Sequence, residues 1–193
     1  MKKVIRTAAM IALMFATATS MANDEKLSLE SNKESKSLVF EMDAQKETVI
    51  KLYDADNHII YSENISATSY SKKFNLKNLA DGRYYFTTED ALRKVTYTVM
   101  VRNSDVEIVD KKENVKPVFK TEGRVVYLNL LNLSKKDVKI EIYDSSNRLV
   151  FSEKRENQMI IEKALNFNKA YSDQYTVVVK DSENTYYENI VID

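Results

Sequence analysis

The stretch IKLYDADNHIIYSE at residues 50–63 recurs in similar form as IEIYDSSNRLVFSE at residues 140–153. Residue type matches at almost every position over an offset of 90 residues, and the Tyr-Asp and Ser-Glu pairs are identical. A match of this kind indicates that one supersecondary unit was duplicated. The sequence therefore predicts two copies of one small module.

Around these stretches, apolar and polar residues alternate with a period of two, which is the pattern of half-buried strands. We expect strands near residues 27–30, 38–43, 48–54, 58–65, 70–76, 83–89 and 93–102, and again near 117–120, 124–131, 137–143, 148–154, 159–163, 174–180 and 185–192. Lys163 to Ala170 has room for a short helical turn at most. Short strands at this spacing predict an all-β fold, namely two tandem Ig-like (fibronectin-like) antiparallel β-sandwiches.

The turns between these strands must be made largely without glycine and proline, because the chain has only two glycines and one proline. Asp54 to Asn57 and Asp144 to Asn147 are the clearest candidates. Asn, Asp and Ser form hydrogen bonds to their own backbone, and Asn and Asp tolerate the left-handed conformation. Both stretches therefore predict tight hairpin turns.

The first residues have the three parts of a secretory signal. Lys2, Lys3 and Arg6 form a positive start, Ala8 to Ala16 is apolar, and Ser20-Met21-Ala22 offers small residues for cleavage. The apolar run is too short for a membrane span, so we expect cleavage rather than retention as an anchor. Ala16-Thr17-Ala18 is an alternative cleavage site.

The chain then divides into segments by composition. The predicted segments are residues 1–22 as a signal peptide, 23–37 as a flexible lead-in with one weak edge strand, 38–109 as β-sandwich module 1, 110–117 as a linker and 118–193 as β-sandwich module 2. The linker is charged and ends at the only proline, which is typical of a domain boundary.

Composition excludes several classes of protein. The absence of cysteine excludes disulfides, thiolate catalysis and thiolate metal sites. Removal of the signal peptide would leave a net charge near −3 with both signs interspersed. This balance argues against a nucleic-acid or anionic-membrane partner.

Val125 to Leu131 is apolar on both faces of a strand. A strand of this kind is covered on both sides when it lies between two domains, so it indicates a contact between the modules. The alternative is a central strand of one sandwich with Tyr127 partly exposed. The sequence alone leaves both interpretations open.

Few residues are candidates for chemistry. His58 lies just past a hairpin turn, which is a poor place for a general base. Asp54, Asp56 and Asn57 resemble the start of a calcium loop, but the required glycine and distal glutamate are missing. We therefore predict no catalytic residue, no metal site and no cofactor.

Tyrosines are the other candidates, because the chain has twelve of them and no tryptophan. Tyr84-Tyr85 and Tyr186-Tyr187 each place one ring on either face of a strand, so one ring of each pair is expected outside. Such rings suit a protein or glycan contact.

The order of motifs in the first copy resembles the C-terminal sorting domain of proteins exported by the type IX (Por) secretion system. These motifs are the strand ending in Tyr53-Asp54, the turn, the apolar strand, then Leu79 to Phe86 and Lys94 to Val101. The resemblance covers residues 38–102 well and 117–192 more loosely. It implies a small Ig-like sandwich with a tyrosine corner at Tyr84, and at Tyr175 in the second copy.

Sequence and resemblance together predict an exported, non-enzymatic protein in the periplasm, at the cell surface or outside the cell. It would act by protein contact or as a structural module, with other exported or cell-envelope proteins as partners. The alternatives are a sorting or docking module of the type IX pathway and a carbohydrate-binding accessory module. We expect no transmembrane segment after the signal is removed.

Overall fold

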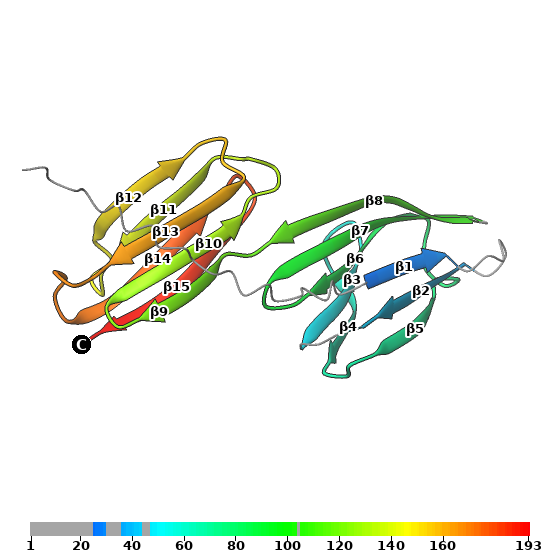
Figure 1. The fold of residues 1–193 in the computed structure, drawn as a ribbon. Coiled ribbons are helices and arrows are strands. Elements are labelled where there is room, and N and C mark those ends of the chain that lie inside the picture. The colour runs from blue at the N-terminus through cyan, green and yellow to red at the C-terminus, as the bar shows by residue number, and fades with distance from the viewer. Residues whose placement is uncertain (1–24, 30–35, 44–46, 104) are drawn as a thin grey trace, which may run out of the picture.

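A computed structural model describes residues 25–29, 36–43, 47–103 and 105–193 (Figure 1). The predicted signal peptide, residues 1–22, lies outside these ranges. Module 1 contains β1 Glu25–Leu29, β2 Ser37–Met42, β3 Thr48–Tyr53, β4 Ile59–Ile65, β5 Tyr70–Asn75, β6 Gly82–Glu89, β7 Arg93–Arg102 and β8 Asp105–Val115. Module 2 contains β9 Val118–Glu122, β10 Val125–Leu131, β11 Val138–Tyr143, β12 Leu149–Arg155, β13 Ile160–Asn166, β14 Asp173–Lys180 and β15 Thr185–Ile192.

The predicted all-β fold of two tandem Ig-like sandwiches is confirmed. Module 1 packs a three-stranded sheet, β1-β2-β5, against a five-stranded sheet, β4-β3-β6-β7-β8. Module 2 packs β13-β10-β9 against β12-β11-β14-β15 (Figure 1). All pairings are antiparallel.

Each module has its own hydrophobic core between its sheets. The core of module 1 is aromatic, with Phe86 fully buried and its ring centroid 5.0 Å from that of Phe40 and 5.2 Å from that of Phe74. The core of module 2 is mainly aliphatic, around residues such as Ile140 and Val177. The two cores share no residue, so each sandwich buries its own apolar surface.

The registers show which residues of the two modules are equivalent. The backbone N–H of Leu76 donates to the Lys36 carbonyl, and the N–H of Phe167 donates to the Arg124 carbonyl, so the same bond closes both three-stranded sheets. Equivalent pairs that follow from the registers are Leu38 and Val126, Phe74 and Leu165, Leu52 and Ile142, and Phe86 and Val177. The modules can therefore be compared position by position.

The predicted asparagine turns are confirmed in both copies. Asn57 has a φ of 65° and Asn147 a φ of 57°, which is the left-handed region. Each turn is preceded by the same register shift, between Leu52 and Tyr53 in module 1 and between Ile142 and Tyr143 in module 2. Because asparagine tolerates this region, the hairpins close without glycine.

The predicted linker is wrong, because residues 110–115 are the second half of β8, paired with Arg93 to Thr98 of β7. The weak edge strand expected in the lead-in is present, since Glu25–Leu29 pairs with β2 as β1. Lys163 to Ala170 contains no helix, because β13 continues to Asn166 and a hydrogen-bonded turn follows it.

The charges of β8 explain why its second half resembles a linker in sequence. Lys111 lies over the Tyr97 ring, with its Nζ atom 5.3 Å from the ring centroid, and Glu113 pairs with Arg93 at 3.2 Å. Charged residues are common on edge strands because they discourage pairing with other chains. The same composition is typical of linkers, so composition alone did not distinguish the two.

Only Lys116 and Pro117 separate β8 from β9, and Lys116 is bound to module 1. Its backbone N–H donates to the Leu92 carbonyl at 2.7 Å. Its ammonium group donates to the Asp90 carbonyl and pairs with Glu89, both at 2.7 Å. The connection between the modules is therefore short and held in place.

Strand β10 is the central strand of its sheet. Val126, Leu128 and Leu130 are buried in the core of module 2, while Tyr127 is 42% exposed, so the central-strand interpretation is correct for these positions. Only the end of the strand meets module 1, where Leu130 and Leu131 line a cavity with Lys112 to Val115 of β8. The modules are also bridged by Glu183, which pairs with Lys112 of β8 at 2.6 Å and with Lys136 at 2.5 Å.

Candidate binding surface

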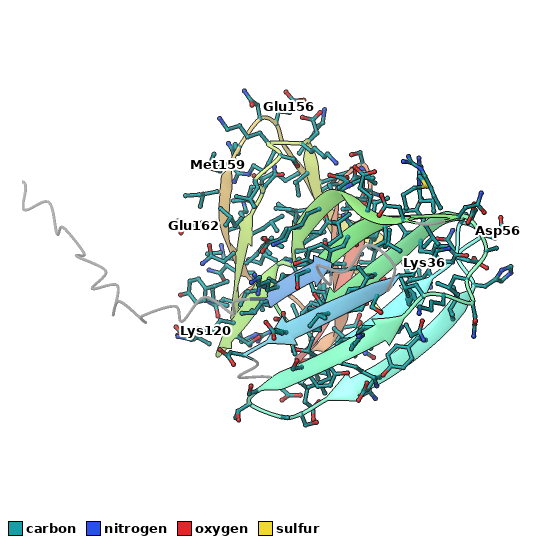
Figure 2. All side chains as sticks on the ribbon, turned by 90° about the vertical axis from the view of Figure 1, so that its right-hand side faces the viewer. Lys36, Asp56, Lys120, Glu156, Met159 and Glu162 are labelled. Atoms are coloured by element: carbon teal, nitrogen blue, oxygen red, sulfur yellow. The ribbon has the colours of Figure 1, made fainter. Side chains whose placement is uncertain are left out.

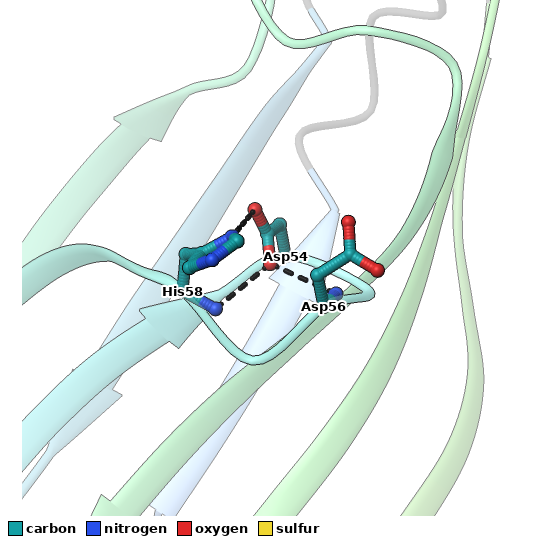
Figure 3. A group of neighbouring side chains, drawn as sticks. All are labelled: Asp54, Asp56 and His58. Atoms are coloured by element: carbon teal, nitrogen blue, oxygen red, sulfur yellow. Dashed lines mark hydrogen bonds and ion pairs between the residues drawn. The ribbon is translucent and has the colours of Figure 1, made fainter.

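The hairpin that holds His58 is a structural turn. One carboxylate oxygen of Asp54 accepts the backbone N–H groups of Asp56 at 2.9 Å and His58 at 2.8 Å (Figure 3). The other oxygen lies 3.1 Å from Nδ1 of His58. These hydrogen bonds hold the pKa of Asp54 below its ordinary value, the His58 backbone bond contributing most.

Module 2 repeats this turn with different side chains, which identifies what the turn needs. Asp144 accepts the backbone N–H groups of Ser146 at 3.0 Å and Arg148 at 2.9 Å, and it pairs with the Arg148 guanidinium at 2.8 Å. Arginine cannot ligate a metal as histidine can. His58 therefore occupies the position of a side-chain partner for the turn aspartate, and the Asp54, Asp56 and His58 cluster needs no ion to explain it.

The predicted tyrosine corners are present in both modules. The Tyr84 hydroxyl donates to the Ala80 carbonyl at 2.9 Å, and the Tyr175 hydroxyl donates to the Tyr171 carbonyl at 3.1 Å. Both tyrosines are buried. Each bond holds the loop before a central strand of the larger sheet, which is a structural role.

A charged clasp joins the two sheets of module 1 at their open side. Glu63 of β4 accepts hydrogen bonds from Lys72 of β5 at 2.8 Å, from Tyr70 at 2.7 Å and from Tyr61. The Lys72 hydrogen bond, followed by those of Tyr61 and Tyr70, lowers the pKa of the Glu63 carboxyl to about 2. Module 2 has a comparable pair, Glu153 and Lys163 at 2.5 Å.

Acid is expected to weaken module 1 through this clasp. The unfolded chain binds a proton at Glu63 near its ordinary pKa of 4.5, whereas the folded protein does so only at about 2. The stabilisation is therefore complete above pH 4.5 and is lost as the pH falls toward 2. Urea unfolding at pH 7 and at acid pH should show a smaller loss for Glu63→Gln than for the wild type. An equal loss in both proteins would show that Glu63 does not cause the acid sensitivity of module 1.

The outer faces of the two three-stranded sheets differ in chemistry. In module 2 this face carries three large aliphatic side chains that are well exposed, Val118 at 46%, Leu131 at 42% and Ile160 at 62%. The positions equivalent to these three in module 1 are Lys26, Asp43 and Ser69, which are also exposed. The same backbone therefore accepts polar residues at all three positions.

We call the side chains of Val118, Lys120, Tyr127, Asn129, Leu131, Ile160 and Glu162 the outer face of module 2. Register places Ile160 opposite Leu131, Ala164 and Lys120 on either side of Tyr127, and Glu162 and Val118 on either side of Asn129. In Figure 2, Lys120, Met159 and Glu162 lie along one side of the molecule. The face is thus apolar near Leu131 and Ile160 and mixed in charge beyond them.

Buried Asn132 fixes the apolar end of this face. Its backbone N–H donates to the Met159 carbonyl at 2.7 Å, and its side-chain amide donates to the carbonyls of Gln158 at 2.8 Å and Lys136 at 2.7 Å. These bonds hold the loop after β10 against the loop before β13. Leu133 and Met159, which are also exposed, are thereby added beside Leu131 and Ile160.

The expected outward tyrosines are found where predicted. Tyr84 is buried and Tyr85 partly exposed, and in the second pair Tyr186 is partly buried while Tyr187 is 67% exposed. The outer face of module 2, in contrast, was missed from the sequence. The face is recognised by comparing it with Lys26, Asp43 and Ser69 at the equivalent positions of module 1, and those equivalent positions are known only from the strand registers.

A comparison with known families finds a match for the first module. Residues 32–102 match the family described as the secretion system C-terminal sorting domain. The match covers module 1 from β2 to the end of β7, in agreement with the resemblance seen in the sequence. It points to a secreted or cell-surface protein.

Solved structures show distant similarity. The BSP domain of a biofilm associated protein is 12% identical, with 87% of this chain and 29% of that chain covered and a TM-score of 0.29. The chicken CNTN1 FN1-FN3 domains are 7% identical, with 82% and 60% covered and a TM-score of 0.31. A beta-glucuronidase from an uncultured Clostridium sp. is 10% identical, with 81% and 35% covered and a TM-score of 0.30. With values this low, none of these structures informs on function.

The chain thus spans less than two thirds of the first two of these structures. No curated protein matches the chain. Within the described ranges, no helix has the length and apolar character needed to cross a membrane.

Proposed function

We propose that this protein is an exported, non-enzymatic two-module protein that binds another protein through the outer face of module 2. The observation that carries the proposal is the contrast between equivalent faces of the two copies. Module 1 has Lys26, Asp43 and Ser69 where module 2 exposes large apolar side chains. Because the fold tolerates polar residues there, Val118 and Ile160 need a reason other than folding, while Leu131 also lines the cavity between β10 and β8.

Binding to a partner supplies this reason. Burial of apolar surface in a complex stabilises the complex by roughly 25 cal/mol for each Å² removed from water. A cluster of such side chains rimmed by polar residues is typical of a protein interaction site. Leu131, Ile160, Leu133 and Met159 form such a cluster, and Lys120 and Glu162 lie at its polar side.

The chemistry of the face favours a protein over a glycan. Glycan sites are built on exposed aromatic rings, whereas this face has the single ring of Tyr127 among aliphatic side chains. Its charges are of both signs, Lys120 on β9 and Glu162 on β13. Aliphatic contacts with a mixed polar rim are the anatomy of a protein interface.

The sorting-domain match supports a second candidate function, in which module 1 directs export or docking in the secretion pathway. The two candidates differ in the module that they require. Changes on module 1 would then alter the location of the protein, whereas changes on the outer face of module 2 would alter its partner and leave its location unchanged.

The face is tested by giving module 2 the residues of module 1. The triple variant Val118→Lys, Leu131→Asp and Ile160→Ser should keep the wild-type stability within about 0.5 kcal/mol, because all three positions are exposed. Exported material from producing cells is then separated by size. We expect the wild type to elute with a second, different protein and the triple variant to elute without it. A partner retained by the triple variant would refute the proposal.

A further inference from the structure

The larger sheet of module 2 has a pocket on its outward side. The pocket lies over β14, which runs between β11 and β15 (Figure 1). Its volume is about 380 Å³, within the usual range of small-ligand sites. We call it the ring pocket, and the residues that line it include Tyr143 of β11, Tyr187 of β15, and Thr176, Val178 and Lys180 of β14. The pocket is on the side of the sandwich opposite to the outer face of module 2.

The floor of the ring pocket is covered although it is on the outside of the sheet. Val178 is 7% exposed, yet it points away from the core, because its neighbours Val177 and Val179 are the residues that point inward. Register places Val178 between Glu141 of β11 and Tyr187 of β15. Glu141 is only 3% exposed. Longer side chains around these two positions therefore rise above them and enclose the pocket.

Two tyrosine rings line the pocket from different strands. Tyr143 and Tyr187 belong to the strands on either side of β14, so their backbones are roughly 10 Å apart across the sheet. Tyr187 is 67% exposed, and Tyr143 is partly exposed. Thr176 and Val178 lie between them and leave the space of the pocket unfilled. Both rings are therefore accessible to a ligand.

Fixed polar groups lie beside these rings. Glu141 pairs with Lys139 at 2.5 Å and with Lys180 at 2.7 Å. These two ammonium groups, that of Lys139 first, lower the pKa of Glu141 to about 2, so its carboxylate is charged at neutral pH and holds Lys180 at one end of the pocket. Further along β14, the Thr176 hydroxyl donates to the side-chain oxygen of Asn189 at 3.0 Å. The pocket thus combines aromatic rings with hydrogen-bond donors and acceptors.

Module 1 places its two outward rings side by side instead. Tyr53 and Tyr85 are directly opposite each other on neighbouring strands, roughly 5 Å apart. Tyr85 occupies the position that Thr176 has in module 2. Thr96, on the next strand, occupies the position of Tyr187. Module 2 therefore has its second ring one strand further away, and this arrangement opens the space between the two rings.

We propose that the ring pocket binds a sugar unit of a glycan. A sugar ring has apolar faces of C–H groups, which pack against aromatic rings, and a rim of hydroxyl groups, which need donors and acceptors at the same time. Tyr143 and Tyr187 suit the faces, and Lys180 and Thr176 suit the rim. An aliphatic side chain in the same place would cover these polar groups without offering them hydrogen bonds, which is unfavourable. The ligand is thus distinct from the protein partner of the outer face.

Binding is tested first with the full mature chain on immobilised polysaccharides, both neutral ones such as cellulose and mannan and acidic ones such as alginate and pectin. A soluble oligosaccharide of the polysaccharide that binds is then titrated and followed by NMR. A single sugar unit in an open pocket should bind weakly, with a Kd of roughly 0.1–1 mM. We expect the backbone amide signals around Val178 and Tyr187 to shift most.

Two variants copy module 1 and each removes one feature of the pocket. Tyr187→Thr copies Thr96 and removes one ring. Thr176→Tyr copies Tyr85 and fills the space between the strands that carry the two rings. We expect each variant to weaken binding roughly five- to tenfold. Tyr187→Phe keeps the ring and should bind more tightly than Tyr187→Thr.

The control is another exposed ring of module 2. Tyr171→Ala copies Ala80 of module 1 and removes a ring that is 89% exposed and does not line the pocket, so it should bind as the wild type does. Tyr187→Thr should still elute with the protein partner of the outer face, so the two proposals can fail independently. No binding to any of the polysaccharides, signal shifts away from β14 and β15, unchanged binding by Tyr187→Thr, or an equal loss in Tyr171→Ala would overturn the proposal.

Discussion

Phe86→Ala should lower the free energy of unfolding of module 1 by about 3–5 kcal/mol, the usual range for the loss of a fully buried ring. Phe86 is not exposed at all, and its ring contacts those of Phe40 and Phe74, with a further aromatic pair to Tyr97 at 6.4 Å. Removal of the ring leaves a cavity among aromatic side chains that cannot easily collapse.

The loss should be confined to module 1, because the two cores share no residue. Hydrogen exchange of backbone amides can follow each module separately. Val177→Ala, at the equivalent buried position of module 2, is the matched control and should weaken module 2 alone. Equal loss of protection in both modules after Phe86→Ala would mean that the sandwiches unfold as one unit.

Tyr84→Phe and Tyr175→Phe should each destabilise their own module by about 1–3 kcal/mol. In both cases a phenyl ring fills the same space, but a carbonyl in the loop before the strand loses its donor. Tyr187→Phe removes the hydroxyl of a ring that is 67% exposed, and it should change stability by less than about 0.5 kcal/mol. If both corner variants matched this control in urea unfolding, the corner bonds would not contribute to stability.

Most strands could be predicted because their side chains alternate. β7 shows this best, since buried Val95, Tyr97, Val99 and Val101 alternate with residues that face outward. The asparagine turns and the tyrosine corners could be predicted because each depends on one residue type at one position. In these cases the structure depends on residues that are close together in the chain, so it can be predicted from one sequence.

The second half of β8 could not be predicted, because its composition is that of a linker although its partner, β7, is the preceding strand. Lys111 and Lys112 pair with Tyr97 and Thr96, and nothing in their own composition favours a strand. The strand forms because β7 is long and needs a partner along its whole length. The residue pattern of this segment alone does not show that β7 needs a partner there.

The outer face of module 2 could not be predicted for a related reason. The hairpins align at an offset of 90 residues, but Val126 follows its equivalent Leu38 by 88 residues and Leu165 follows Phe74 by 91. A single offset therefore compares the wrong residues on β10 and β13. Only the strand registers set Leu131 against Asp43 and Ile160 against Ser69.

The most direct test of the account is a comparison of these equivalent positions in producing cells. A photoreactive amino acid is placed at Ile160 of module 2 or, as the matched control, at Ser69 of module 1. Crosslinked products are then separated by mass, so that a second copy is distinguished from a different protein. We expect Ile160 to give one discrete product with a different protein and Ser69 to give none. Equal products at both positions, or none at Ile160, would contradict the claim that the two copies have diverged to make a binding face.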